Sequence, residues 1–422
     1  MLRPKPAPLT VSLRACNLRR TMRRFRRLEV MIVLLALISF ASHAAAAKVV
    51  LYNPLDGAEG EPLWQSILPQ FAQESPDLEV RQLPLEGKDL TEALNLAQQP
   101  GNAVFTIVYA LRLPQLADEG VIAPLDEVTD PALWEDHYPK VVKTVTYKGK
   151  IWALPLEANP YALYCNLPMF RAAGLPLPKT WEDTLAAARA LTKDFDGDGK
   201  IDQYGYTQCT YQFPLELWSY GLNIVTEDGQ VDLDAPKAAE ILHWYWELRH
   251  YSPPHVDFER NDVAMKISIT DNLDRYRHLD FAVVPLPRGE RRINSLGGSN
   301  STLGLVMLRG SDPEAAKRFL AFWSRPEIYL RWCTWTHNLP LRRSVRESEA
   351  YHRYLLRVPE MQVFNEEFEY AIGRPCIPQY EPAHEIVARA TGWCSSQDTQ
   401  PTIEACQERL HQAAEEIRAL FK

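Results

Sequence analysis

The segment from residue 147 to residue 166, YKGKIWALPLEANPYALYCN, restricts the fold of this chain more than any other stretch. It opens as a tight turn, in which Gly149 can take the positive φ that a hairpin needs. Pro155 and Pro160 each remove a backbone donor and force the preceding residue out of the helical region. We therefore expect two short strands joined by a stiff, extended bridge. Such a bridge suits a chain that passes from one lobe to another, although two successive edge strands of one sheet would show the same local pattern.

Strand and helix patterns alternate on both sides of this bridge. Thr180 and Asp183 have the spacing of a capping box, and Asp312 followed by Pro313 is typical of a helix start. The alternation predicts an α/β fold with helices on both faces of a sheet. Strands are predicted at residues 48–53, 78–83, 103–109, 151–154, 161–165, 205–209, 263–269, 280–284 and 303–308. Helices are predicted at residues 61–75, 89–99, 113–119, 167–173, 181–191, 215–220, 235–250, 313–323, 327–335 and 402–421.

The first 47 residues have the layout of a secretory signal peptide. Six arginines between residues 19 and 27 precede an apolar run at 30–40, and small residues follow as far as Ala47. The apolar run is shorter than the roughly 20 residues that span a bilayer. We expect export to the periplasm with cleavage near Ala47, and both Met1 and Met22 are candidate starts.

The expected mature chain is strongly acidic. Residues 1–47 hold nine of the 46 Lys and Arg and one of the 54 Asp and Glu, so their removal leaves a net charge of −16. Such a surface repels nucleic acid and anionic lipid. We therefore expect no nucleic-acid partner and a soluble protein that acts as a monomer.

Cysteine usage agrees with export. Cys16 leaves with the signal peptide, and the six that remain allow up to three disulfides. These six are Cys165, Cys209, Cys333, Cys376, Cys394 and Cys406. Only Cys394 and Cys406 form a local pair, around a polar loop. Zinc is disfavoured, because the chain has no CxxC pair and its histidines are scattered.

An acidic loop, DFDGDGKIDQYG at residues 194–205, has the spacing of a calcium-binding loop. Its candidate ligands stand at relative positions 1, 3, 5, 7 and 9, namely Asp194, Asp196, Asp198, Lys200 and Asp202. Gly199 allows the sharp turn, but Gly205 replaces the usual bidentate Glu at position 12. The alternative is that the Asp side chains accept hydrogen bonds from the amides of the loop itself. A bound Ca²⁺ would be structural, and we expect no required cofactor.

Aromatic residues beside predicted turns are a second signal, because aromatic planes can stack on the apolar faces of sugars. The chain has 11 Trp, and the aromatic residues beside turns are Tyr109, Tyr161, Tyr211, Phe213, Trp218, Trp332, Trp335 and Tyr380. Burial in the core is the alternative for each. Signals for an enzyme are poor, since the chain has no GxSxG, HExxH or P-loop. Cys165 is better explained as a disulfide partner than as a nucleophile, and paired carboxylates alone leave a glycosidase open.

Several motifs, in this order, resemble one family. They are LADEGVIAPLDEV, the bridge segment, LPKTWEDTLAAARALTK with DFDGDGKIDQYGY, AMKI with DFAVVPLP, LGGSNSTLGLVM, DPEAAKRFLAFWSRPEIYLRW and NLPLRRSV. Together they resemble the extracellular solute-binding proteins of sugar ABC importers, in the group of the maltose-binding protein, over residues 48–390. The resemblance implies two α/β lobes with a ligand cleft between them and closure by hinge bending. Lobe one would be 48–157 plus 296–343, and lobe two 158–295 plus 344–422.

The resemblance also implies which residues face the ligand. Carried over by position, these are Asn53, Asp56, Tyr109, Asn159, Tyr161, Tyr211, Trp218, Asp271, Gly298, Ser299, Trp335, Arg374 and Tyr380, with His384 on a nearby segment. Asp271 departs from the family, which often has an aromatic residue there, so a polar contact is expected in place of stacking. The implied function is periplasmic binding of a sugar or oligosaccharide for delivery to an ABC permease, without catalysis. Two alternatives stay open: a secreted carbohydrate-active enzyme, and a binding protein for a polyol, a glycerol phosphoester or a peptide.

Overall fold

The computed structural model describes residues 47–53, 61–84, 91–207, 209, 211–252, 257–297 and 302–422. Residues 48–422 form one compact unit. The predicted signal peptide lies outside the described residues. Among the described residues, no helix combines the length and the apolar character that a membrane span requires.

The larger of the two main sheets has the strand order β2-β1-β3-β12-β4, and β7 also pairs with β12. β1 runs parallel to β3, whereas β12 runs antiparallel to β3, β4 and β7. β12 lies far along the chain, so the chain returns to this sheet after building other elements. The strands are β1 (Ala47–Asn53), β2 (Leu78–Pro84), β3 (Ala103–Tyr109), β4 (Ile122–Ala123), β7 (Leu154–Glu157) and β12 (Leu303–Leu308).

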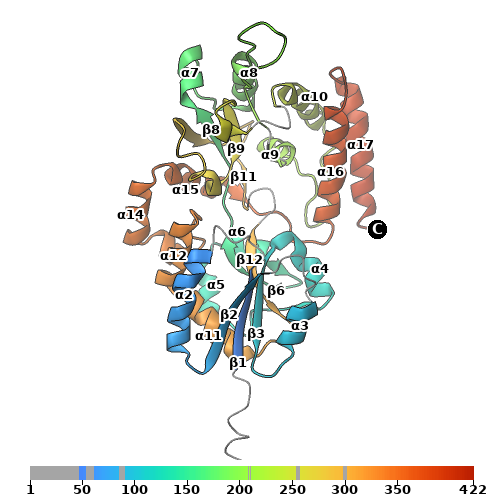
Figure 1. Ribbon diagram of the computed structural model, residues 1–422. Coiled ribbons are helices and arrows are strands. Elements are labelled where there is room, and N and C mark those ends of the chain that lie inside the picture. The colour runs from blue at the N-terminus through green and yellow to red at the C-terminus, as the bar shows by residue number, and fades with distance from the viewer. Residues whose placement is uncertain are drawn as a thin grey trace, which may run out of the picture. The chain divides into compact units, whose positions relative to one another are not determined.

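Helices cover both faces of this sheet, as predicted (Figure 1). Val104 of β3 packs in a cluster with Ala93 of α3 (Thr91–Ala97) and Leu113 of α4 (Leu113–Asp118). The next residue, Phe105, points to the other face, because side chains alternate along a strand. There its ring centroid lies 5.0 Å from that of Phe319 in α11 (Pro313–Trp323). α2 (Glu61–Glu74) and α12 (Pro326–Trp335) complete this face through the contacts of Trp64 with Trp323 and Trp332.

The second main sheet has the order β10-β8-β9, and both pairings are antiparallel. Its strands are β8 (Ala162–Asn166), β9 (Met265–Ser268) and β10 (Phe281–Pro285), and every residue of β8 is buried. The predicted strand at 205–209 is wrong: Tyr204 and Thr207 form only isolated bridges. Gly205 explains this, because a Cβ there would lie 1.9 Å from the Ala188 carbonyl oxygen. The backbone packs directly on α8 (Trp181–Leu191) and does not extend a ladder.

Most predicted element boundaries agree with the structure. The capping box of Thr180 and Asp183 is present at α8, and Asp312 caps α11. α7 (Leu167–Ala173) ends at Gly174 in the left-handed conformation, and Gly149 has a positive φ between β5 (Thr146–Tyr147) and β6 (Lys150–Ile151). The sequence patterns missed α5 (Pro131–Asp136), α6 (Pro139–Thr144) and the small parallel pair of β11 (Asn294–Ser295) and β13 (Ala371–Ile372).

The C-terminal half is largely helical. α16 (Tyr380–Ser395) and α17 (Ile403–Ala419) lie side by side and pack with α10 (Pro236–His250) and α9 (Gln212–Ser219) around one apolar cluster (Figure 1). Another cluster joins β8 to the helices that follow α12. The helices in this cluster are α14 (Glu349–Arg357) and α15 (Glu360–Tyr370), which follow the short α13 (Arg343–Arg346). Short 3-10 turns lie at Ala110–Arg112, Phe258–Arg260 and Thr270–Asn272.

Candidate functional site

Tyr211 lies at the centre of a buried group of side chains. The guanidinium carbon of Arg374 lies 3.5 Å from the centroid of the Tyr211 ring. The ring centroids of Trp218 and His384 lie 5.7 and 5.1 Å from it, and the hydroxyls of Tyr211 and Tyr380 are hydrogen-bonded. We name these five residues the Tyr211 cluster. The structure thus brings together residues far apart in the sequence that were predicted to face the ligand, and their contact with a ligand stays a prediction.

The Tyr211 cluster carries one positive charge, on Arg374. Arg374 is only 4% exposed, and its guanidinium stacks on the ring face, where the electrons of the ring attract a cation. Burial, with the Arg374 charge adding to it, lowers the pKa of His384 to about 4, so this imidazole is neutral at pH 7. Burial also raises the pKa of Tyr211, which stays protonated. The Tyr211 cluster is therefore a buried group of aromatic side chains with one positive charge.

A hollow of about 330 Å³ is lined by Trp218 of the Tyr211 cluster, and we name it the Trp218 hollow. It is lined by Lys143, Trp218, Asn223, Val225, Thr226, Glu227, Asp228, Ile372, Gly373 and Pro375. Lys143 Nζ lies 3.0 Å from Glu227 Oε1, and the Thr226 hydroxyl donates to Asp228 at 2.5 Å. The Thr226 hydroxyl also holds the pKa of Asp228 below its usual range, so this carboxylate is ionised at neutral pH. One indole edge and several hydrogen-bonding groups thus share one small volume.

Sequence reasoning missed most of the residues that line the Trp218 hollow. Lys143 lies on α6, a six-residue helix that the patterns did not predict. Residues 226–229, TEDG, have the composition of a turn, and the Thr226 amide and carbonyl oxygen do bond within that turn. A turn signal shows where the chain reverses but not what it faces. No local pattern could have brought Lys143 to Glu227.

Trp335, the last residue of α12, lines a second hollow of about 530 Å³, which we name the Trp335 groove. The groove is lined by Ser66, Arg331, Thr334, Trp335, Tyr354, Arg357 and Val358. Trp335 is 53% exposed, which is rare for an indole that has only a packing role. This exposure agrees with its prediction as a stacking surface, although the structure places it apart from the Tyr211 cluster.

Asn159 lies in the bridge between β7 and β8, where three chain segments meet. Its backbone oxygen accepts from the Gly297 amide at 3.1 Å, and its side-chain oxygen accepts from the Leu339 amide at 3.0 Å. Its side-chain nitrogen donates to Asn338 Oδ1 at 2.5 Å. Asn159 is fully buried, so in this conformation its side chain ties the crossing segments together and does not face solvent.

Tyr161 follows in the same bridge and is also held by a neighbouring segment. Asn294 of β11 accepts from the Tyr161 amide at 2.9 Å and donates to the Tyr161 carbonyl at 2.7 Å. Asn294 also donates to Glu367, which receives two hydrogen bonds from Arg292. Tyr161 is buried in the core around β8, so its predicted ligand contact also stays a prediction.

The other predicted ligand residues lie in several places. Tyr109 ends β3 opposite Leu303 and is 40% exposed, whereas Asp271 is exposed in a 3-10 turn and accepts from Asn272. Asn53 is the last residue of β1, but its side chain lies outside the part of the chain that the structure describes. Three predicted residues also lie outside the described residues, namely Asp56, Gly298 and Ser299.

The acidic loop brings three of its carboxylates together. One oxygen from each of Asp194, Asp196 and Asp202 lies within 4.8 Å of the others. These carboxylates also accept amide hydrogen bonds inside the loop, which is the metal-free alternative stated above. Asp194 accepts from the amides of Gly197 and Gly199 at 2.7 and 2.9 Å, which lowers its pKa. Three hard oxygen donors fit Ca²⁺, whereas Asp198 turns to its own loop and to Lys200.

All six cysteines of the described residues are free thiols, so the predicted disulfides are not formed in this structure. Cys394 on α16 and Cys406 on α17 nevertheless meet, and their thiols are hydrogen-bonded to each other. Both side chains are fully buried, and Cys394 Sγ also lies 3.2 Å from the Leu242 carbonyl oxygen. The local pairing predicted from the sequence is therefore compatible with the fold.

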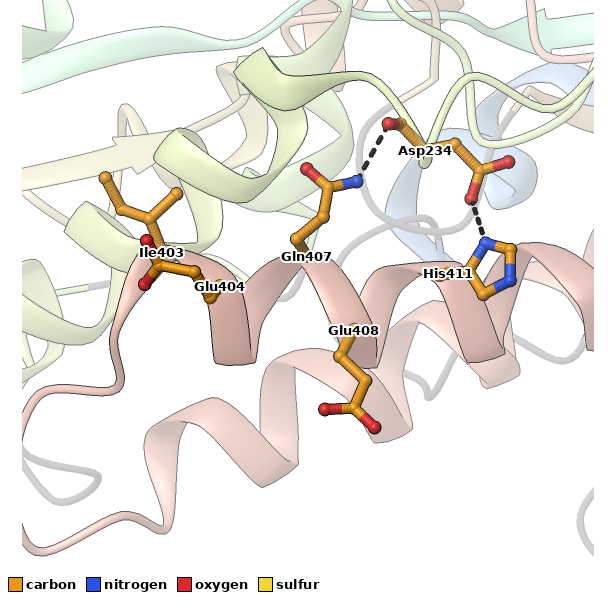
Figure 2. Close-up of a pocket in the computed structure, with 6 residues that line it drawn as sticks. All are labelled: Asp234, Ile403, Glu404, Gln407, Glu408 and His411. Carbon is orange, nitrogen blue, oxygen red and sulfur yellow. Dashed lines mark hydrogen bonds and ion pairs between the residues drawn. The ribbon is translucent and has the colours of Figure 1, made fainter.

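A further hollow, of about 550 Å³, lies along α17 (Figure 2). Gln407 and His411 both turn toward Asp234, as Figure 2 shows: Gln407 donates to its carbonyl and His411 lies 2.9 Å from its carboxylate. Arg418 also binds the Asp234 carboxylate. Glu408 points away from this group (Figure 2). These polar groups attach α17 to the turn before α10, so we assign them a structural role.

Comparison with known proteins agrees with this geometry. Residues 67–358 match the family described as bacterial extracellular solute-binding protein. A Brucella abortus protein described as a binding protein is 23% identical over 379 residues, which are 84% of this chain and 90% of the relative. An Escherichia coli protein described as an ABC transporter periplasmic-binding protein is 22% identical over 302 residues, covering 65% of this chain and 68% of the relative.

A solved structure shows the same fold. The cyclic alpha-maltosyl-1,6-maltose binding protein from Arthrobacter globiformis superposes with a TM-score of 0.73 at 21% identity, covering 88% of this chain and 98% of that one. The predicted two-lobed periplasmic binding protein fold is therefore confirmed, while the lobe boundaries at 157, 296 and 343 stay a prediction. This chain belongs to the bacterial extracellular solute-binding protein family.

Proposed function

We propose that this chain binds a sugar or oligosaccharide in the periplasm and delivers it to the membrane subunits of an ABC transporter. The observation that carries the proposal is the Trp218 hollow beside the Tyr211 cluster. The Trp218 indole offers an apolar contact for a sugar ring, and Asn223, Thr226 and Asp228 offer partners for its hydroxyls. The structural relative that binds cyclic alpha-maltosyl-1,6-maltose supports a carbohydrate ligand.

Binding in this proposal needs no covalent step. A sugar that enters the hollow exchanges water for fixed hydrogen bonds, and the lobes close around it by bending at the crossing segments. The ion pair between Lys143 and Glu227 lies at the edge of the hollow and helps to order its polar side. The relatives are binding proteins, which favours binding over the alternative of a carbohydrate-active enzyme.

A sugar panel tests this proposal. We expect isothermal titration calorimetry to show saturable binding of at least one mono- or oligosaccharide, and incubation to release no product. D228A should weaken that binding at least tenfold, because a charge-assisted hydrogen bond contributes roughly 1.5–3 kcal/mol. W218A should weaken it too, but Trp218 is 4% exposed, so its loss also costs about 3–5 kcal/mol of stability. W134A, in a half-buried tryptophan that lines none of the hollows named above, is the control. Turnover, or unchanged affinity in D228A, would contradict the proposal.

We also infer export and a monomeric state. The arginine-rich and apolar N-terminal sequence supports cleavage near Ala47, and the E. coli relative is described as periplasmic. The acidic mature chain supports a protein that does not bind nucleic acid. Mass spectrometry of the secreted protein should find Lys48 at the N-terminus, and a mass that still includes the first 47 residues would contradict cleavage.

A structural Ca²⁺ in the acidic loop is a separate proposal. It rests on the sequence spacing and on the three carboxylates that meet there. Calcium chloride at millimolar concentration should raise the melting temperature of the wild type, because a ligand that binds only the folded state stabilises it. D196N should lose most of this increase, and magnesium chloride should give a smaller one. No response in the wild type would mean that the loop is held by its own amides, and an equal response from D196N would mean that calcium acts at another site.

A further inference from the structure

The charges in the Trp335 groove differ from those in the Trp218 hollow and in the hollow along α17. Two arginines line the groove, Arg331 and Arg357, and no carboxylate does. By contrast, the Trp218 hollow includes Glu227 and Asp228, and the hollow along α17 includes three acidic residues. The expected mature chain is strongly acidic, with 53 acidic against 37 basic side chains, so a cationic groove is not the average surface.

The two arginines are not neutralised by the described part of the protein. Arg331 donates only to neutral acceptors, at 2.9 Å to the Ser66 hydroxyl and at 3.4 Å to Gln70 and to the Ser66 carbonyl. Within the described residues, Arg357 has no hydrogen-bond or ion-pair partner. A guanidinium stays charged at any physiological pH, so both sites keep their positive charge.

Two other arginines, one on α11 and one directly before α12, show the opposite behaviour. Arg318 of α11 makes two hydrogen bonds to Asp77, at 2.7 and 2.8 Å. Arg325, directly before α12, makes two to Glu74, at 3.0 and 2.6 Å. Asp274 acts electrostatically on Tyr354 in the groove, but its carboxylate is already bonded to Arg277 and His337. Arg331 and Arg357 are therefore the guanidiniums that remain available to an anion in this groove.

From this arrangement we infer that the Trp335 groove binds a saccharide that carries an anionic group, either a carboxylate or a phosphate. The half-exposed Trp335 indole stacks on the sugar ring, and the planar guanidiniums of Arg331 and Arg357 bind the anion, for which their fork geometry is suited. This inference rests on the proposed function and adds a second sugar site, apart from the Trp218 hollow, that takes an anionic sugar. A neutral sugar would leave both charges without an anionic partner among the described residues.

Matched ligands test the inference. The probes are glucuronate, galacturonate and glucose 6-phosphate, each compared by calorimetry with its neutral counterpart, glucose or galactose, and with the corresponding disaccharides. We expect at least one anionic member to bind at least tenfold more tightly than its counterpart, and this ratio to fall as sodium chloride increases. The uronates and the phosphate ester distinguish the two kinds of anion. W335A should weaken the preferred ligand, which places the site in this groove.

Arginine variants decide between this groove and another site. R331Q and R357Q should each reduce the ratio of anionic to neutral affinity about tenfold, since each removes a charge-assisted hydrogen bond. R353Q is the control, because Arg353 lies on the same helix but is paired with Glu349. Equal binding of neutral and anionic sugars, or an unchanged ratio in R331Q and R357Q, overturns the inference and leaves the sugar-binding proposal intact. Binding of no sugar at all overturns both.

Discussion

At the scale of single residues, Glu216 is a carboxyl that the fold places in surroundings unfavourable for a charge. It is 1% exposed on α9, and burial raises its pKa to about 8. Gln212 Nε2 and Trp244 Nε1 donate to its two oxygens at 2.7 and 3.1 Å, which only partly offsets the burial. At pH 7 the carboxyl is therefore largely protonated, and no cation neutralises it among its bonded partners.

The raised pKa of Glu216 predicts a loss of stability at alkaline pH. The folded pKa exceeds the unfolded one, so the stabilisation is complete below about pH 4.5 and is lost as the pH rises through about 8. The free energy of unfolding of the wild type, measured in urea, should be lower at pH 9.5 than at pH 6. Glu216 should account for a few kcal/mol of this difference, at about 1.4 kcal/mol per pKa unit. E216Q should remove that part of the difference, because a glutamine does not titrate. The new amide can still be hydrogen-bonded if Gln212 turns its own amide around, since Tyr206, the other partner of Gln212, can either donate or accept. E385Q, in an exposed glutamate, is the control, and an E216Q difference as large as that of the wild type would refute the assignment.

The site residues show what a sequence pattern can and cannot predict. Tyr211, Trp218, Arg374 and Tyr380 were carried over by position, and the structure does bring them together. Asn159 was carried over in the same way, yet its side chain is buried and bonded to Asn338 and Leu339. Local spacing cannot distinguish these outcomes, because the deciding partners, Tyr380 for Tyr211 and Asn338 for Asn159, lie 169 and 179 residues away.

At the scale of elements, local chemistry was the best guide. The helix starts at Thr180 and Asp312 were predicted correctly, because a capping side chain and its target amide lie within three residues. The strand predicted at 205–209 failed for the opposite reason. Whether this segment forms a strand depends on the close approach of Gly205 to Ala188, which is a tertiary contact. The six-residue helices α5 and α6 are too short for a periodic pattern to show.

The contact between α16 and α17 predicts a disulfide that forms on oxidation. Oxidised glutathione should take two electrons and two protons from Cys394 and Cys406 and join the two helix ends. Alkylation should then count two fewer of the six thiols, and mass spectrometry should find one peptide pair. A closed loop of about 13 residues should stabilise the fold by about 3 kcal/mol in the chain-entropy account. In C394A, oxidation should neither remove two thiols nor raise the stability. In C165S, oxidation should still remove two thiols and raise the stability as in the wild type. Six reactive thiols in the oxidised wild type would contradict the prediction.

At the scale of the whole molecule, the closure that we propose requires the crossing segments to bend while the sheets on either side stay intact. Asn159 joins the bridge after β7 to Gly297 and to the segment at 338–339, so one side chain and one carbonyl couple three connections. Asn294 ties the same bridge to β11 through Tyr161. A hinge made of several strands moves as a unit only if such bonds persist, because otherwise each segment would bend alone.

N159A tests whether this residue couples the crossing segments or contacts the ligand. If it couples them, the variant leaves the Leu339 amide and the Asn338 side chain without their partner, and each buried polar group then costs about 1–3 kcal/mol. Urea unfolding should therefore show a loss on the order of a few kcal/mol. N272A is the control, because Asn272 bonds only to nearby Ser268 and Asp271 and should cost much less. If N159A instead kept its stability and lost only sugar affinity, Asn159 would be a ligand contact, as the sequence alone had predicted, and the three segments would have to be held together by Asn294.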